Sequence, residues 1–235
     1  FCWGLAPASG AIVGAILGLT TRLGHRSIAA FMSVGAGVLL SAASFKVASE
    51  ALVLDGVAST IVGIVAGAAT FSIANAALAT AKDRKRCGEC KPQPSEAEAP
   101  GSGTSIALGT ALDAVPEALV VGAALRAGGA DLTLVIALSL ASVPQALSGT
   151  AGMRLASRSP TYVLILWFGS AVVTAALTAV AFYFLRDLGP HLTAILKAYG
   201  AGALIAMTAE TMIPEAFHNG PPYSADLAAA GFAAL

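Results

Sequence analysis

Two short patches of the chain place polar side chains beside a proline within an apolar run: LDAVPEAL at 112–119 and LASVPQAL at 140–147. Asp113 and Glu117 are four residues apart, so both carboxylates lie on one face of a helix. Two carboxylates this close repel each other unless a cation lies between them. The proline between them removes a backbone donor and leaves a carbonyl oxygen nearby. Carboxylate and carbonyl oxygens that converge in an apolar setting predict a cation site.

The second patch repeats this arrangement with uncharged groups, because Ser142 and Gln145 stand beside Pro144 in a matching register. We expect the two proline-containing helices to face each other across one cavity, which Glu210 closes from a later helix. There are simpler alternatives. The two carboxylates could form a proton relay without a metal ion, and Gln145 could only form a hydrogen bond between helices. The predicted cation ligands are Asp113, Glu117, Ser142, Gln145 and Glu210.

Four more polar residues are candidates for gating, entry or exit. Lys46 and Glu50 are four residues apart and could equally form an ion pair at a helix end. Glu215 follows Glu210 by five residues, off the same face of a regular α-helix, and IPEAFHNGPP predicts a helix end there. His218 is either a landing point for a metal ion or a solvated loop residue.

These polar groups lie in a very apolar chain. Hydrophobic residues make up 57% of the sequence and charged residues 11%, far fewer charges than in soluble domains. The apolar runs are continuous rather than alternating, which favours membrane-spanning helices over a membrane β-barrel. We predict an all-α, polytopic membrane protein with eight transmembrane helices, at roughly 1–21, 28–48, 56–81, 104–125, 131–153, 161–185, 189–214 and 223–235. The chain lacks an initiating methionine and its last apolar run is short, so we expect both ends to be incomplete.

The basic residues predict the orientation. Nine of the thirteen Lys and Arg residues lie in alternate loops, the ones that follow the first, third and fifth apolar segments. Cytoplasmic loops are enriched in Lys and Arg, so we place these loops in the cytoplasm and both termini on the extracytoplasmic side. The predicted location is the inner (plasma) membrane, with the lipid bilayer as the surrounding partner.

One polar linker divides the chain. We expect transmembrane helices one to three in 1–81, a flexible cytoplasmic loop in 82–103 and helices four to eight in 104–235. Cys87 and Cys90 in this loop form a lone C-x-x-C pair, which is half of a zinc site or a redox pair, and more often a reduced, solvated pair. The neighbouring basic run is a topology signal, or it contacts anionic lipid headgroups.

The chain resembles the ZIP (Zrt/Irt-like) family of divalent metal transporters. LDAVPEAL is similar to the family's fourth-helix motif His-Asn-x-Pro-Glu-Gly, LASVPQAL to its fifth-helix motif, and GAGALIAMTAETMIPEAF to its seventh helix. The resemblance implies an eight-helix bundle, a homodimer and a metal site in mid-membrane. At the matching positions Asp113 replaces His, Ala114 replaces Asn, Glu117 is retained and Gln145 replaces Glu.

From this resemblance we expect transport of a divalent transition-metal cation into the cytoplasm, with zinc as the family's usual substrate and cadmium, iron or manganese as other substrates. The predicted ligands carry only oxygen donors, which suit harder ions better than zinc. The alternative is a non-transporting relative, a sensor or partner subunit, in which Lys46 neutralises the carboxylates. No nucleic-acid partner is expected. Neither H-E-x-x-H nor G-x-S-x-G occurs in the sequence, so we expect no enzymatic activity.

Overall fold

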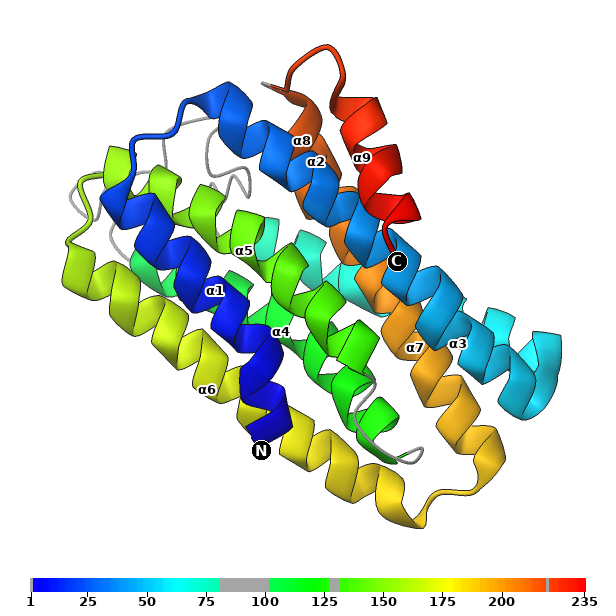
Figure 1. The fold of residues 1–235 in the computed structure, drawn as a ribbon. Coiled ribbons are helices and arrows are strands. Elements are labelled where there is room, and N and C mark those ends of the chain that lie inside the picture. Colours follow the sequence, from blue (N-terminus) through cyan, green and yellow to red (C-terminus); the bar gives the residue numbers. More distant parts are fainter. Residues whose placement is uncertain (1, 81–101, 127–131, 219) are drawn as a thin grey trace.

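The computed structural model describes residues 2–80, 102–126, 132–218 and 220–235, and nearly all of them are helical (Figure 1). No strand occurs in these ranges, so the all-α prediction is confirmed. Most of the linker predicted at 82–103, with Cys87 and Cys90, lies outside the described residues. The elements are α1 (Cys2–Thr20), α2 (His25–Ser41), η1 (Ala42–Ala48), α3 (Ser49–Thr80), α4 (Ser102–Arg126), α5 (Leu132–Leu155), α6 (Pro160–Phe184), η2 (Leu185–Asp187), α7 (Pro190–Met207), η3 (Thr208–Met212), α8 (Ile213–His218) and α9 (Ser224–Ala233).

Six helical stretches within the described ranges are long and apolar enough to cross a membrane, so the chain is a multi-pass membrane protein by the hydropathy of its helices. Eight separate spans are not seen. The predicted segments 28–48 and 56–81 belong to one helical stretch of 54 residues, and α9 has only ten residues. The six stretches are Trp3–Thr20, His25–Leu78, Ile106–Arg126, Leu132–Leu155, Pro160–Asp187 and Pro190–His218.

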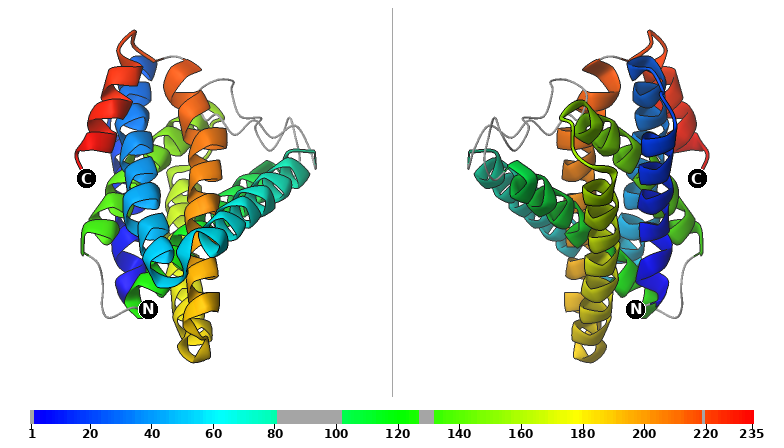
Figure 2. Two further views of the ribbon diagram at one scale, coloured as in Figure 1. Left: turned by 90° about the vertical axis from the view of Figure 1, so that its right-hand side faces the viewer. Right: turned by 90° about the vertical axis from the view of Figure 1, so that its left-hand side faces the viewer.

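The 54-residue stretch is bent back on itself at Gly56. At about 1.5 Å per residue, a straight helix of this length would far exceed the hydrocarbon layer of about 30 Å. Gly56 has φ +82° and ψ −174°, a conformation that residues with a side chain rarely adopt, and the chain reverses there (Figure 2). Asp55, next to it, is bound by Ser59 and by His191 at the start of α7, which fastens the turn to that helix.

The helices form two groups. In the first bundle, α1 packs along α5 and α6, and α4 packs along α6. In the second bundle, α3 packs along α7, and α2 packs along α8 and α9. The two bundles meet where α5 contacts α2 and where α4 contacts α7 (Figure 1). The two helices with the proline patches, α4 and α5, therefore lie in the first bundle, and both π-helical turns, η1 and η3, pack within the second.

Small residues form close contacts inside each bundle, where they let the helix backbones approach each other. A Cβ atom at Gly14 of α1 would overlap the carbonyl of Val143 on α5, and one at Gly67 of α3 would overlap the carbonyl of Tyr199 on α7. Between the bundles the contact is different, because Gly35 of α2 faces the side chain of Pro144. Within each bundle the helix backbones are in direct contact at these glycines. Between the two bundles the contact at Gly35 is made by a side chain.

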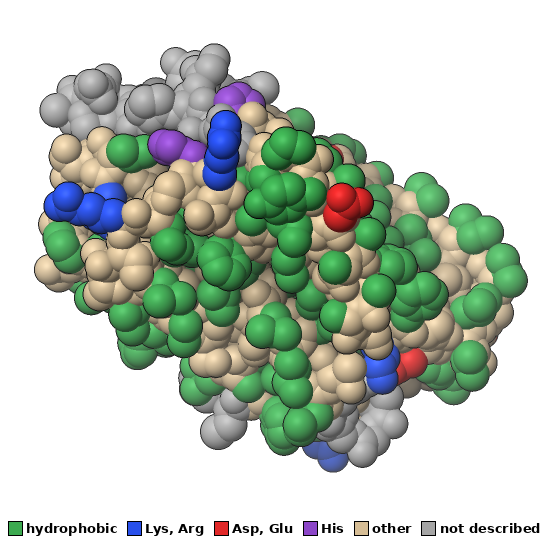
Figure 3. Space-filling model, turned by 45° about the horizontal axis from the view of Figure 1, so that its top comes forward, with side chains coloured by type: hydrophobic (Ala, Val, Ile, Leu, Met, Phe, Trp, Pro, Cys, Tyr) green, Lys and Arg blue, Asp and Glu red, His purple; other side chains and the backbone are tan. Residues whose placement is uncertain are grey.

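The loops alternate between two ends of the molecule. One end, called here the arginine-rich end, carries the connections α1–α2, α5–α6 and α8–α9 (top of Figure 2). Arg22, Arg26, Arg154 and Arg158 lie at this end, where Figure 3 shows basic and histidine side chains gathered above an apolar flank. Arg154 Nη1 donates to the carbonyls of Gly18 (2.6 Å) and Thr21 (2.8 Å), which completes the end of α1.

Candidate cation site

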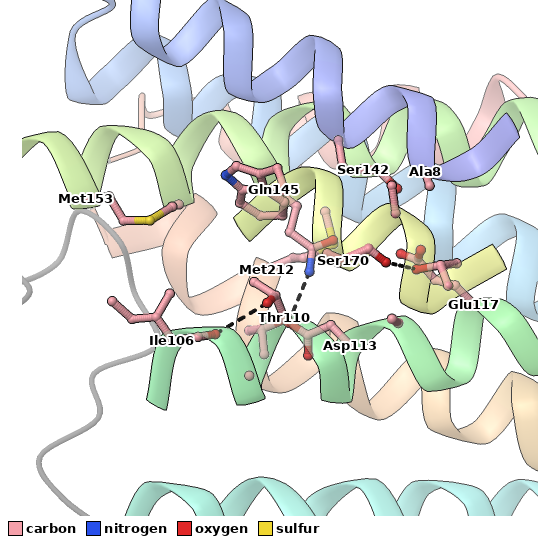
Figure 4. A pocket seen from close by; sticks show the side chains of 18 of the residues that line it. Ala8, Ile106, Thr110, Asp113, Glu117, Ser142, Gln145, Met153, Ser170 and Met212 are labelled. Atoms are coloured by element: carbon pink, nitrogen blue, oxygen red, sulfur yellow. Dashed lines mark hydrogen bonds between the residues drawn. The ribbon is translucent and has the colours of Figure 1, made fainter. Parts of the chain in front are cut away.

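A cavity of about 130 Å³ lies between the two bundles (Figure 4). Its walls come from α1, α4, α5 and α6 on one side and from α2, η3 and α8 on the other. It runs from the middle of the helices to the arginine-rich end: Ile106 near the start of α4 and Met153 near the end of α5 line one part, and Glu117 and Ser142 line the deepest part. Among the described residues, none in the opposite third of α4, α5 or α6 lines it.

The structure brings together four of the five predicted ligands, because Asp113, Glu117, Ser142 and Gln145 all line this cavity. Gln145 Nε2 donates a hydrogen bond of 3.2 Å to Asp113 Oδ2, so the two polar patches face each other as predicted. The Ser142 hydroxyl donates to the carbonyl of Leu138 at 2.8 Å, which leaves its oxygen able to accept or to coordinate.

Glu117 is the least compensated group at the site. It is 7% exposed, and within the described part of the chain no hydrogen bond to its carboxylate is found. Asp113 lies one helical turn away on the same face of α4, so a second carboxylate faces the same cavity. A buried carboxylate without a partner is costly, and its cost falls when a cation binds beside it.

Proline contributes the backbone chemistry on both helices. Pro116 in α4 and Pro144 in α5 are buried, and each helix continues through its proline. A proline cannot donate to the carbonyl four residues earlier, so Leu112 and Leu140 lose the usual intrahelical donor. Such irregularity at membrane depth is tolerated where it lines a cavity, and it adds polar oxygen atoms near the carboxylates.

The donor set is nevertheless small. Among the residues that the structure describes, no three His, Cys, Asp or Glu side chains lie close enough together to hold a metal ion. Asp113 and Glu117 therefore offer two carboxylates and Gln145 one amide, and Glu215, a third carboxylate in the cavity wall, does not cluster with them in this conformation. Water molecules, or further side chains brought in by a movement of the bundles, would have to complete the coordination of a divalent ion.

The prediction for Glu210 is wrong. Glu210 is exposed and turned towards α3, where Ser72 and Asn75 donate to its two oxygens. Glu215, expected off the cavity face, instead lines the cavity and is 9% exposed. The cause is η3, a π-helical turn over Thr208–Met212. A π-helical turn inserts an extra residue, so the side chains beyond it are rotated relative to a regular α-helical register.

The other three candidates also lie outside the cavity. Glu50 accepts a hydrogen bond of 2.7 Å from Lys197 Nζ on α7, so its ion-pair partner is on another helix. Lys46 lies in η1 and does not line the cavity, and neither does His218, which is exposed at the end of α8. Lys197 is 2% exposed, and its position in an otherwise apolar run was the signal for a buried partner.

Sequence reasoning missed three methionines, Met32, Met153 and Met212, which line the cavity. It also missed Trp167, whose Nε1 donates 3.0 Å to the hydroxyl of Thr150 and holds the ring in the cavity wall. Methionine and tryptophan are common in membrane helices, so their residue types alone gave no indication of the cavity. The sequence contains only four methionines, so their positions could have been compared individually.

The geometry defines a class of protein: a helical, multi-pass membrane protein with a polar, carboxylate-bearing cavity between two helix bundles. Comparison with protein-family models gives no match, and comparison with curated proteins gives none either. The residues that line the cavity are therefore the basis for a proposed function.

Proposed function

We propose that the protein carries a divalent transition-metal cation through the inner (plasma) membrane into the cytoplasm. The observation that supports this proposal most is Glu117, a buried carboxylate without a hydrogen bond among the described residues, beside Asp113 in an intramembrane cavity. Ionisable groups at membrane depth are costly and usually mark an ion pathway. Zinc is the expected substrate through the resemblance to the ZIP family, which also implies the homodimer and the eight-helix arrangement.

The arginine-rich end is the cytoplasmic end in this proposal, because cytoplasmic loops are enriched in Lys and Arg. Both termini of the eight-helix arrangement then lie on the extracytoplasmic side, with the 54-residue stretch crossing twice and α9 belonging to the eighth crossing. In this proposal the conformation described above is open inward, since the cavity extends from the middle of the helices towards this end. Glu215 lies on the route by which an ion would leave.

Transport requires the carboxylates to meet each side of the membrane in turn. Asp113, Glu117 and Gln145 all belong to the first bundle, so they move together if that bundle shifts against the second. Backbone contacts through glycine hold each bundle rigid, whereas the contact between the bundles is made by side chains, as at Gly35 and Pro144. A rocking motion at this interface would close the inward route and open an outward one.

Uptake by reconstituted protein tests the proposal. The full chain in proteoliposomes loaded with a zinc-sensitive dye should accumulate Zn²⁺ saturably, and Glu117→Ala and Asp113→Ala should abolish uptake. Glu210→Ala is the matched control, because Glu210 is a carboxylate outside the cavity, bound to Ser72 and Asn75. It should retain uptake.

Absence of uptake and of binding for Zn²⁺, Cd²⁺, Fe²⁺ and Mn²⁺ would reject the proposal and favour the non-transporting relative. Lys46→Ala then separates the alternatives, since a carrier keeps or gains metal affinity without Lys46, whereas a scaffold loses only stability. The cavity favours the carrier, because Lys46 is not among the residues that line it.

A further inference from the structure

Methionine is concentrated at the cavity. Three of the four methionines in the sequence, Met32, Met153 and Met212, line it, and each is at most 1% exposed. They come from three elements: α2, α5 and η3. Figure 4 shows Met153 at the same end of the cavity as Ile106, and Met212 nearer to Gln145 and Asp113. The fourth, Met207, belongs to the same buried apolar cluster as Met32 and Met212 but does not line the cavity.

These side chains change the donor chemistry of the site. Carboxylate and amide oxygens are hard donors that suit Mg²⁺, Ca²⁺ and Mn²⁺, whereas a thioether sulfur is a soft donor that favours softer ions. The expectation from sequence was an oxygen-only set, and the structure adds up to three sulfur atoms to the same walls. Methionine also fills irregular gaps, but leucine fills a similar volume without a sulfur atom. The two roles are therefore separable by substitution.

Both bundles contribute to this sulfur set. Met153 belongs to the first bundle with Asp113 and Glu117, whereas Met32 and Met212 belong to the second. An ion held by the carboxylates would meet the second bundle's thioethers in the conformation in which the cavity extends to the arginine-rich end. A relative movement of the bundles would change the number of sulfur atoms within reach of the ion.

We infer that Met32, Met153 and Met212 supply thioether ligands to the cation as it passes through this cavity, Met153 at the arginine-rich end, and thereby select soft cations, with Cd²⁺ as the diagnostic ion, over hard ions such as Mn²⁺. This inference rests on the proposed function, since it requires a cation beside Asp113 and Glu117. It narrows the substrate from divalent transition metals in general to thiophilic ones.

The test compares Cd²⁺ and Mn²⁺ binding to the purified full chain. Cys2, Cys87 and Cys90 are first replaced by serine, because their thiols would bind Cd²⁺ independently of the cavity. The triple variant Met32→Leu, Met153→Leu, Met212→Leu is then compared with its parent, and Met207→Leu is the matched control. X-ray absorption at the cadmium edge reports whether sulfur lies in the first coordination shell.

The parent should bind Cd²⁺ more tightly than Mn²⁺ and show a cadmium–sulfur shell. The triple variant should lose that shell and at least about tenfold in Cd²⁺ affinity, about 1.4 kcal/mol, with Mn²⁺ affinity unchanged. Met207→Leu should behave as the parent. Met153→Leu alone, a smaller perturbation of packing, should weaken the sulfur shell if the triple variant does not fold.

Two results would overturn the inference. A parent that binds both ions through Glu117 without a sulfur shell, or a triple variant that keeps the parent's ratio of Cd²⁺ to Mn²⁺ affinity, assigns the methionines to packing and leaves the carrier proposal intact. A parent that binds neither ion rejects the carrier proposal itself and this inference with it.

Discussion

Two intramembrane carboxylate settings in this molecule differ in one respect. Glu50 on α3 receives a hydrogen bond of 2.7 Å from the Lys197 ammonium, which is 2% exposed. Glu117 on α4 is nearly as buried as Lys197, but the ionisable side chain one helical turn away on the same face of α4 is Asp113, another carboxylate. The first setting contains its own cation. The second contains two like charges and room for a cation.

The difference separates fold from function. A buried ion pair is satisfied without any external ligand, so the Glu50–Lys197 contact can be explained by the joining of α3 to α7. Two carboxylates that share a cavity gain nothing for the fold, because their mutual repulsion and burial both act against it. Such a setting persists where binding needs it, as sites that trade stability for function do.

The largest expected effect comes from removing the internal cation. Lys197→Met leaves Glu50 without its partner, and we expect a loss of about 3 kcal/mol in the free energy of unfolding, the lower end for a broken buried pair because Glu50 is 40% exposed. Denaturant titration of the detergent-solubilised protein measures it. The double variant Lys197→Met, Glu50→Gln should recover most of the loss. A single variant as stable as the parent would mean that the contact contributes nothing.

The second prediction concerns Glu117, where we expect substitution to lower metal affinity and not stability. Glu117→Gln keeps the shape of the side chain and removes one of two like charges, so metal-free stability should be unchanged or higher. Zn²⁺ affinity should fall by about fiftyfold, roughly 2.3 kcal/mol, because an ionised ligand becomes a neutral amide. Isothermal calorimetry and thermal unfolding of the same preparation provide both values. A destabilised variant with normal affinity would assign Glu117 to the fold and remove the contrast with Glu50.

The sequence predicted the setting of Glu117 but not that of Glu50. Asp113, Glu117, Ser142 and Gln145 share a cavity as the two proline patches indicated, because a spacing of four residues and a common register constrain the faces of α4 and α5. These inferences required only regular helices. The all-α architecture followed in the same way from the continuous apolar runs.

The failures occur where the helix is irregular or where partners are distant in sequence. Glu215 lines the cavity and Glu210 does not, because Glu210 lies within a π-helical turn that no spacing rule for α-helices anticipates. The sequence suggested Lys46 as the ion-pair partner of Glu50, whereas the structure pairs Glu50 with Lys197, 147 residues away. The reversal at Gly56, by contrast, lies at the predicted break between the segments 28–48 and 56–81, and one residue with positive φ makes it.

A third and smaller effect is expected at Asp113. Its Oδ2 already accepts a hydrogen bond of 3.2 Å from Gln145, so part of its charge is balanced within the site. Asp113→Asn should therefore lower Zn²⁺ affinity by about tenfold, roughly 1.4 kcal/mol, less than Glu117→Gln does. The comparison is made by calorimetry in one buffer. Equal losses in both variants would show that the hydrogen bond does not distinguish the two carboxylates.

The smallest effect comes from changing the amide at Gln145 to a carboxylate. Gln145→Glu adds a further carboxylate to the three that line the cavity and exchanges the donor to Asp113 for a repulsive neighbour. Metal-free stability should fall, while Zn²⁺ affinity should rise by about fivefold, roughly 1 kcal/mol, because the ion gains an ionised ligand. Gln145→Leu, of similar size and without donor or acceptor, should lower both. If Gln145→Glu loses stability without gaining affinity, the ion does not reach α5, and the cavity must be treated as a site of the fourth helix alone.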